Sequence, residues 1–109
     1  MSTARVLAAA LALVTTAAAG QSYDVRTELW DRPRTAAAVA ADDGVRRAVL
    51  EMLSRPQSRL AIRHGAGQEA ALQAEELRSW LGALAIDPRR IELRSDLAGS
   101  VPLRLEITP

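Results

Sequence analysis

Residues 58–93 read SRLAIRHGAGQEAALQAEELRSWLGALAIDPRRIEL, and this stretch decides the predicted fold. Apolar and polar residues alternate over 59–63, which is the period of a half-buried strand. A glycine-rich turn at 64–67 leads into a long amphipathic segment, predicted as a helix over 68–84. Alternation returns over 90–94 after an Asp-Pro turn. The stretch therefore predicts a strand, a helix and a second strand in succession.

The long segment has one apolar side and carries its acidic residues early, where a helix dipole favours negative charge. Glu69, Gln73, Glu75 and Glu76 are expected to lie mostly outside the buried face. The residues predicted to be buried are Ala70, Ala74, Leu77, Trp80, Leu81 and Leu84.

Similar patterns extend in both directions from this stretch. Residues 22–29 alternate as a strand, and 35–41 could form a short helical turn. Asp42-Asp43-Gly44 supplies a fresh helix N-cap, and the helix that follows is expected to end at Arg55-Pro56. Residues 101–108 alternate as a final strand, in which Pro102 favours an edge position. The predicted apolar stripe of the helix after the N-cap is Val45, Val49, Met52 and Leu53.

The predicted order is β-α-β-α-β-β, which gives a two-layer α/β (α+β) sandwich with a mixed four-stranded sheet. Strands joined through helices are expected to be parallel, and the last two strands to form an antiparallel hairpin. Because every strand alternates, both helices should cover one face of the sheet, and the other face should carry arginine and acidic pairs in water. Residues 21–109 are expected to form one domain.

Residues 1–20 have the order of a cleavable signal peptide. Arg5 is followed by an apolar run at 6–14 and by small residues at 17–19, so cleavage is expected after Ala19 or near Gln21. The run is shorter than the roughly 20 apolar residues of a membrane-spanning helix. We therefore expect export to the periplasm and no membrane span after cleavage.

Charge and composition restrict the chemistry. Fourteen arginines less Arg5 leave thirteen, which equal the thirteen acidic residues, so a nucleic-acid partner is not expected. With no cysteine and one histidine, His64, neither a thiol nucleophile nor a zinc site is expected. The scattered serines show no nucleophile–base arrangement, and we expect no enzyme activity, cofactor or metal.

Residues 58–93 resemble the C-terminal domain of OmpA-like proteins, most closely over 74–91, where an (A/G)-I-x-x-x-x-I step enters a strand. The resemblance implies a β-α-β-α-β-β fold and peptidoglycan binding in the periplasm. That family uses an aspartate in its turn and an arginine before the alanine that Ala74 matches; here the turn reads Gly65-Ala66-Gly67 and the arginine is Gln73. The fold is therefore expected without the usual wall-binding pair.

Arg63-His64-Gly65 also matches the R-H-G of the histidine phosphatase superfamily, in which the histidine accepts a phosphoryl group. That chemistry needs a second histidine and a larger domain. A tight turn is the alternative role for these residues. Backbone N–H groups at Gly65 and Gly67, beside Arg63, could instead bind an anion, although a turn needs glycine as well.

Two tryptophans remain. Trp80 lies on the apolar helix face and is predicted to be core, whereas Trp30 precedes a polar loop and could contribute to an interface. The sequence therefore predicts an exported, non-enzymatic envelope domain that binds another envelope protein or a cell-wall component. The alternatives are a peptidoglycan module with altered residues around Arg63 and Gln73, or a small phosphatase-like enzyme that uses His64.

Overall fold

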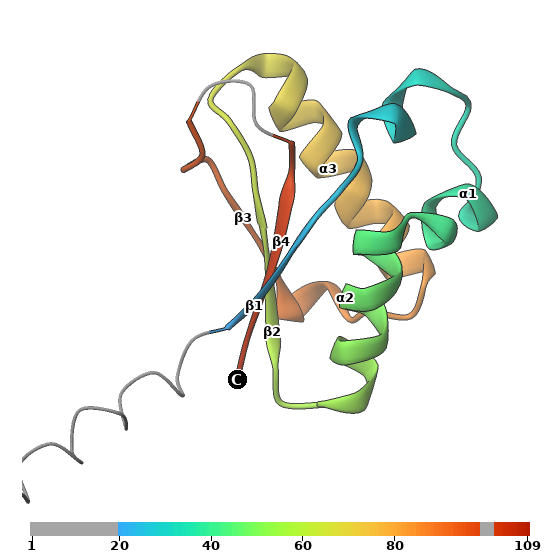
Figure 1. The fold of residues 1–109 in the computed structure, drawn as a ribbon. Coiled ribbons are helices and arrows are strands. Elements are labelled where there is room, and N and C mark those ends of the chain that lie inside the picture. Colours follow the sequence, from blue (N-terminus) through green and yellow to red (C-terminus); the bar gives the residue numbers. More distant parts are fainter. Residues whose placement is uncertain (1–19, 99–101) are drawn as a thin grey trace, which may run out of the picture.

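The computed structural model describes residues 20–98 and 102–109. A four-stranded sheet contains β1 (Gln21–Asp24), β2 (Arg59–Arg63), β3 (Ile91–Arg94) and β4 (Arg104–Thr108) in the order β1-β4-β2-β3. β4 pairs antiparallel with β1 and β2, and β2 pairs parallel with β3. The sheet is mixed and open, so the predicted fold class is confirmed (Figure 1). The predicted signal peptide lies outside the described residues, apart from Gly20.

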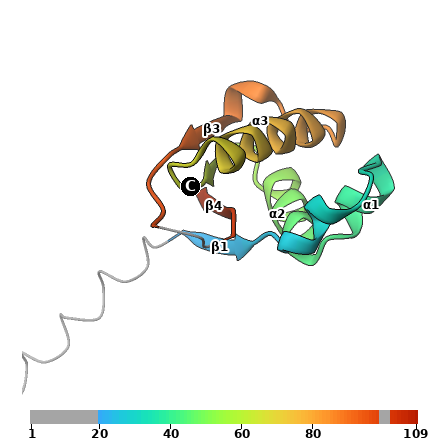
Figure 2. The same cartoon turned by 90° about the horizontal axis from the view of Figure 1, so that it is seen from above.

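Three α-helices form the second layer, on one side of the sheet (Figure 2). α2 (Asp43–Ser54) packs on β1 and β4, and α3 (Gln68–Ala83) packs on β2 and β3. The short α1 (Ala36–Ala41) contacts both longer helices. The helix predicted over 68–84 is thus correct to within one residue.

The core lies between the two layers and draws on every strand or its flanks. Leu60, Ile62, Leu105 and Ile107 are almost fully buried at the centre of the sheet. α2 adds Val45, Ala48 and Met52, and α3 adds Ala74, Leu77 and Leu81. Leu53 was predicted in the core but is 51% exposed, because Val45, Ala48 and Met52 already occupy the inward positions i, i+3 and i+7.

The opposite face of the sheet has the predicted wet, mixed-charge character. Arg94 pairs with Glu92 and Glu106, Arg104 pairs with Asp24, and Arg63 pairs with Asp96. These exposed pairs contribute little stability individually, but they intersperse three arginines with four acidic residues on this face.

The predicted antiparallel hairpin of the last two strands is wrong. β4 inserts between β1 and β2, and β3 takes the edge. The burial explains this arrangement: Leu103, Leu105 and Ile107 are all buried, whereas Leu93 on β3 is only partly buried. Pro102 does not force an edge position because it precedes the ladder, which begins at Arg104. Val101, the first residue of the strand predicted over 101–108, lies outside the described residues.

The first strand is shorter than predicted. β1 ends at Asp24, although the Val25 N–H still bonds to the Leu103 carbonyl at 2.9 Å. The 3-10 helix η2 (Thr27–Asp31) follows and places Leu29 in the core and Thr27 in solvent. Val25 and Leu29 are four residues apart, a spacing that fits a helical turn as well as a strand.

The N-terminus of α2 follows the predicted chemistry closely. Asp42 accepts from the Val45 N–H as the N-cap of α2, and its other oxygen accepts from the Arg26 N–H. Gly44 lies so close to β1 that a Cβ there would be 2.1 Å from the Asp24 carbonyl oxygen. This close approach fixes α2 against the end of β1.

Candidate functional site

Four side chains join the segment around η2 to α3: Trp30, Arg34, Glu76 and Trp80. Arg34 Nε donates to Glu76 Oε2 at 2.5 Å, and Arg34 Nη2 donates to Oε1 at 3.1 Å. Trp80 Nε1 donates to Glu76 Oε2 at 3.0 Å. The Arg34 guanidinium lies 5.2 Å from the centroid of the Trp30 ring, within cation–π range. One ion pair therefore holds both tryptophans of the chain.

Each half of this cluster consists of two residues that are four positions apart in the sequence. Trp30 and Arg34 are four residues apart, and Arg34 Nη1 also donates to the carbonyls of Trp30 at 3.3 Å and Arg32 at 3.0 Å. Glu76 and Trp80 are four apart on α3, so they lie on the same helix face. The Arg34 guanidinium is thus satisfied on several sides and holds the chain after η2 in one conformation.

The electrostatics match this geometry. Hydrogen bonding from Arg34, then from Trp80, holds the pKa of the Glu76 carboxyl below its ordinary value of 4.5. The hydrogen bond with Glu76 correspondingly raises the pKa of Arg34. Both groups are therefore charged at neutral pH, and neither is suited to proton transfer there.

An open hollow of about 450 Å³ lies beside the cluster, between η2 and the first half of α3. Leu72 on its α3 side is 62% exposed, so it adds an apolar contact surface to the hollow. The hollow is lined by Trp30, Arg34, Gln68, Glu69, Leu72, Gln73 and Glu76. Trp30 and Gln73, each a candidate from the sequence, are brought together here.

The candidates around the glycine turn lie elsewhere. Arg63 is on the open sheet face, where its Nε donates to Asp96 at 2.9 Å. His64 is only 7% exposed; its N–H bonds to the Arg94 carbonyl, and its carbonyl accepts from the Leu97 N–H. His64 Nδ1 lies 2.8 Å from the Gly65 carbonyl oxygen. The histidine therefore extends the pairing of β2 with the chain after β3.

The two glycines differ in environment. Gly65 is buried beside His64, whereas Gly67 is exposed at the N-cap of α3 and has open space around it. Arg63 and Gln73 were grouped in one altered wall-binding site, but they belong to different surfaces: the open sheet face and the hollow.

Arg34, Leu72 and Glu76 are site residues that the sequence reasoning missed. Leu72 lies off the apolar stripe of α3, and that exposed leucine was the available signal. The i, i+4 spacings of Trp30 with Arg34 and of Glu76 with Trp80 were the other hints. The joining of the two halves depends on the tertiary fold.

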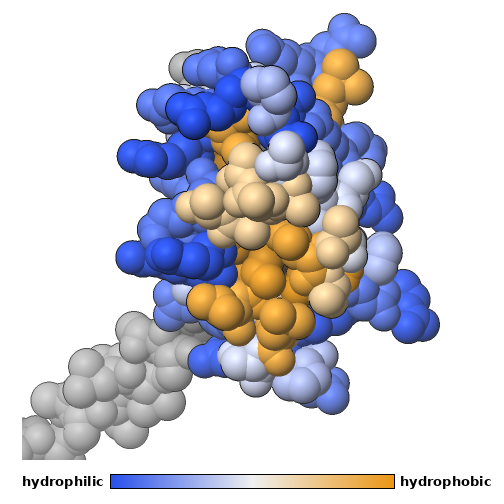
Figure 3. Space-filling view, turned by 90° about the vertical axis from the view of Figure 1, so that its right-hand side faces the viewer, coloured by the Kyte–Doolittle hydropathy of each residue, from blue (hydrophilic) through white to orange (hydrophobic). Residues whose placement is uncertain are grey.

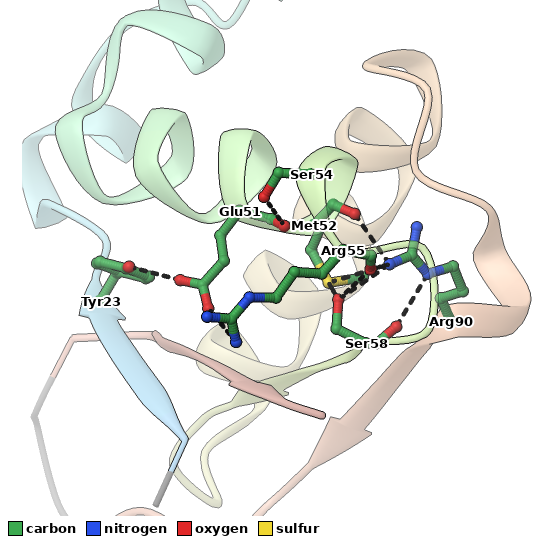
Figure 4. Close-up of polar contacts among 7 residues, drawn as sticks. All are labelled: Tyr23, Glu51, Met52, Ser54, Arg55, Ser58 and Arg90. Atoms are coloured by element: carbon green, nitrogen blue, oxygen red, sulfur yellow. Dashed lines mark hydrogen bonds and ion pairs between the residues drawn. The ribbon is translucent and has the colours of Figure 1, made fainter.

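A second polar cluster is structural (Figure 4). The Arg90 guanidinium donates to the carbonyls of Met52 at 3.0 Å, Arg55 at 2.8 Å and Ser58 at 2.9 Å, so it caps the end of α2. Arg90 is therefore partly buried, whereas the side chain of its neighbour Arg89 is 90% exposed. On the other side of α2, the Tyr23 hydroxyl donates to Glu51 at 2.7 Å, which raises the pKa of Tyr23.

An apolar surface lies on the side that carries α1 and α2 (Figure 3). Leu50 and Leu53 of α2 are 61% and 51% exposed, and Ala36, Ala37 and Ala41 of α1 are exposed too. A hollow of about 220 Å³ reaches the α1 part of this surface at Ala41, but Leu50 and Leu53 line neither that hollow nor the one beside Trp30. Leu50 therefore offers an exposed apolar position away from the hollow beside Trp30.

Within residues 20–98 and 102–109, no three His, Cys, Asp or Glu side chains are grouped to hold a metal ion. No helix in these ranges combines the length and apolar character needed to cross a bilayer. Comparisons with protein-family models, curated proteins and solved structures found no match.

Proposed function

We propose that this protein is an exported, non-enzymatic domain of the cell envelope that binds another protein through the hollow beside Trp30. The observation that carries the proposal is the ion pair of Arg34 with Glu76, which holds Trp30 beside the exposed Leu72. Tryptophan and arginine dominate the energetics of protein interfaces. Because these side chains are already held, binding would order few further groups.

Export is supported by the signal-like leader, and the residue that follows the expected cleavage position packs on the sheet. A Cβ on Gly20 would lie 2.3 Å from the Ile107 carbonyl oxygen, so the backbone at Gly20 packs tightly against β4. Gly20 directly follows the expected cleavage position after Ala19. We expect the intact mass of the periplasmic protein to correspond to a chain that starts at Gly20.

A photo-reactive residue tests the binding surface. Benzoylphenylalanine replaces Leu72 in the producing cells, and in a matched strain it replaces Leu50, which is equally exposed but lies on α2. Irradiation should yield a discrete cross-linked protein from position 72 only, and Trp30→Ala should abolish it. Equal products from both positions, or none from position 72, would contradict the proposal.

The cell-wall alternative is tested in parallel. Gln73 lines the hollow, so a wall ligand bound there should sediment the protein with purified peptidoglycan, and Gln73→Ala should release it. If the ligand of the hollow is a protein, as we propose, the wild-type chain should stay in the supernatant. If the wild-type protein sediments with peptidoglycan and the Gln73→Ala variant does not, the ligand of the hollow is the cell wall and not a protein.

A further inference from the structure

We propose that the hollow takes an extended polypeptide segment that presents a basic side chain close to an aliphatic one. This inference rests on the proposed function and names the chemistry of the partner. It follows from the order of charged, polar and apolar groups along the floor of the hollow.

The floor is one stripe of α3. Glu69, Leu72, Gln73 and Glu76 occupy positions i, i+3, i+4 and i+7, so they share one helix face opposite Trp30 and Arg34. At 1.5 Å per residue the stripe is about 10 Å long, which matches about three residues of extended chain. A short strand-like segment therefore fits its length.

The charge in the hollow is not balanced. Arg34 and Glu76 neutralise each other at one end through two hydrogen bonds. Glu69 at the other end makes no ion pair or side-chain hydrogen bond within residues 20–98 and 102–109. One negative charge is thus left over, next to the exposed Leu72, and a cationic side chain beside an aliphatic one complements both.

The amides complete the recognition surface. Gln68 and Gln73 line the hollow, and each amide can both donate to and accept from a peptide backbone. Leu72 and the Trp30 ring provide the apolar contact. This combination favours a polypeptide over a purely lipidic or purely anionic ligand.

The test uses the exported protein, 15N-labelled, and three capped pentapeptides: acetyl-Ala-Arg-Ala-Leu-Ala-amide, the same peptide with Glu for Arg, and the same peptide with Ser for Leu. The first peptide should shift the Trp30 indole and the amides of the first half of α3. Glu69→Gln should weaken its binding about threefold to fivefold, as expected for one exposed charge pair. Glu75→Gln, an exposed α3 acid outside the hollow, should leave binding unchanged.

Leu72→Ser should abolish the shifts without unfolding the protein, because Leu72 is largely exposed. Equal binding of the Arg and Glu peptides, or no binding of the Arg peptide, would overturn the inference. If position 72 still cross-links a partner in cells, the proposed function survives that result. If cross-linking fails too, both are wrong.

Discussion

Arg34 and Glu76 are 42 residues apart in the sequence, and their side chains meet in a two-point ion pair, with Arg34 Nε 2.5 Å from Glu76 Oε2 and Nη2 3.1 Å from Oε1. Their side chains are 26% and 36% exposed, so water screens the pair only in part. The pair connects the chain after η2 to the middle of α3. Its main effect is on the position of Trp30 and on the shape of the hollow.

Glu76→Gln should loosen this connection. Because both tryptophans contact the pair, their emission should shift to the red and the thermal midpoint should fall slightly. In the wild type the lowered pKa of Glu76 means that its contribution is complete above the ordinary value of 4.5 and is lost as pH falls through the lower folded value. Fluorescence across pH 2 to 6 measures this loss, and Glu75→Gln is the control. An unchanged spectrum for Glu76→Gln would refute the linkage.

Arg90→Ala should destabilise the fold by about 2 kcal/mol, because the Met52 and Arg55 carbonyls at the end of α2 and the Ser58 carbonyl before β2 lose a charged donor. Urea unfolding followed by circular dichroism measures the change. Arg89→Ala is the matched control, since the Arg89 side chain is 90% exposed and bonds mainly to Asp87. Equal effects of the two variants would contradict the capping role of Arg90.

Ala85→Gly should stabilise the fold by up to about 1 kcal/mol. Ala85 has a φ of 80°, and it ends α3 in a Schellman arrangement in which the Ile86 N–H bonds to the Leu81 carbonyl at 3.0 Å. Glycine adopts this left-handed conformation without a Cβ penalty. Ala83→Gly, at the last residue of α3, lacks that benefit and should not stabilise the fold. A lower thermal midpoint for Ala85→Gly would contradict this prediction.

Two glycines should respond to alanine in opposite directions. Gly44→Ala should cost about 1–3 kcal/mol, because the new Cβ would lie 2.1 Å from the Asp24 carbonyl oxygen and α2 must move away from β1. Gly82→Ala should add about 0.5–1 kcal/mol, since Gly82 lies within α3 and has open space around it. Thermal unfolding of both variants tests the pair, and a stabilising Gly44→Ala would show that this close approach is not tight.

Sequence periodicity alone sufficed for much of the fold. The alternation at 59–63, the helical period of 68–84 and the cap at Asp42 depend on neighbours within a few residues, and all three agree with the elements of the structure, although Ala70, Trp80 and Leu84 are only partly buried. The same alternation predicted the solvated sheet face with its arginine and acidic pairs. The spacing of apolar residues indicates which side of a helix or strand is buried, because the residues on that side recur with the period of the helix or strand.

Only the tertiary structure decided the order of the strands and the place of the site. The pattern of 101–108 is the same for an edge strand and a central one, and its insertion between β1 and β2 depends on how much of it the helices bury. The sequence identified Trp30 and Gln73 as two separate candidate binding residues, without showing that they lie together. The contact of Arg34 with Glu76 joins segments 42 residues apart, and no local period encodes such a contact. It forms because the packing of α3 on β2 and β3 places Glu76 beside the chain that follows η2.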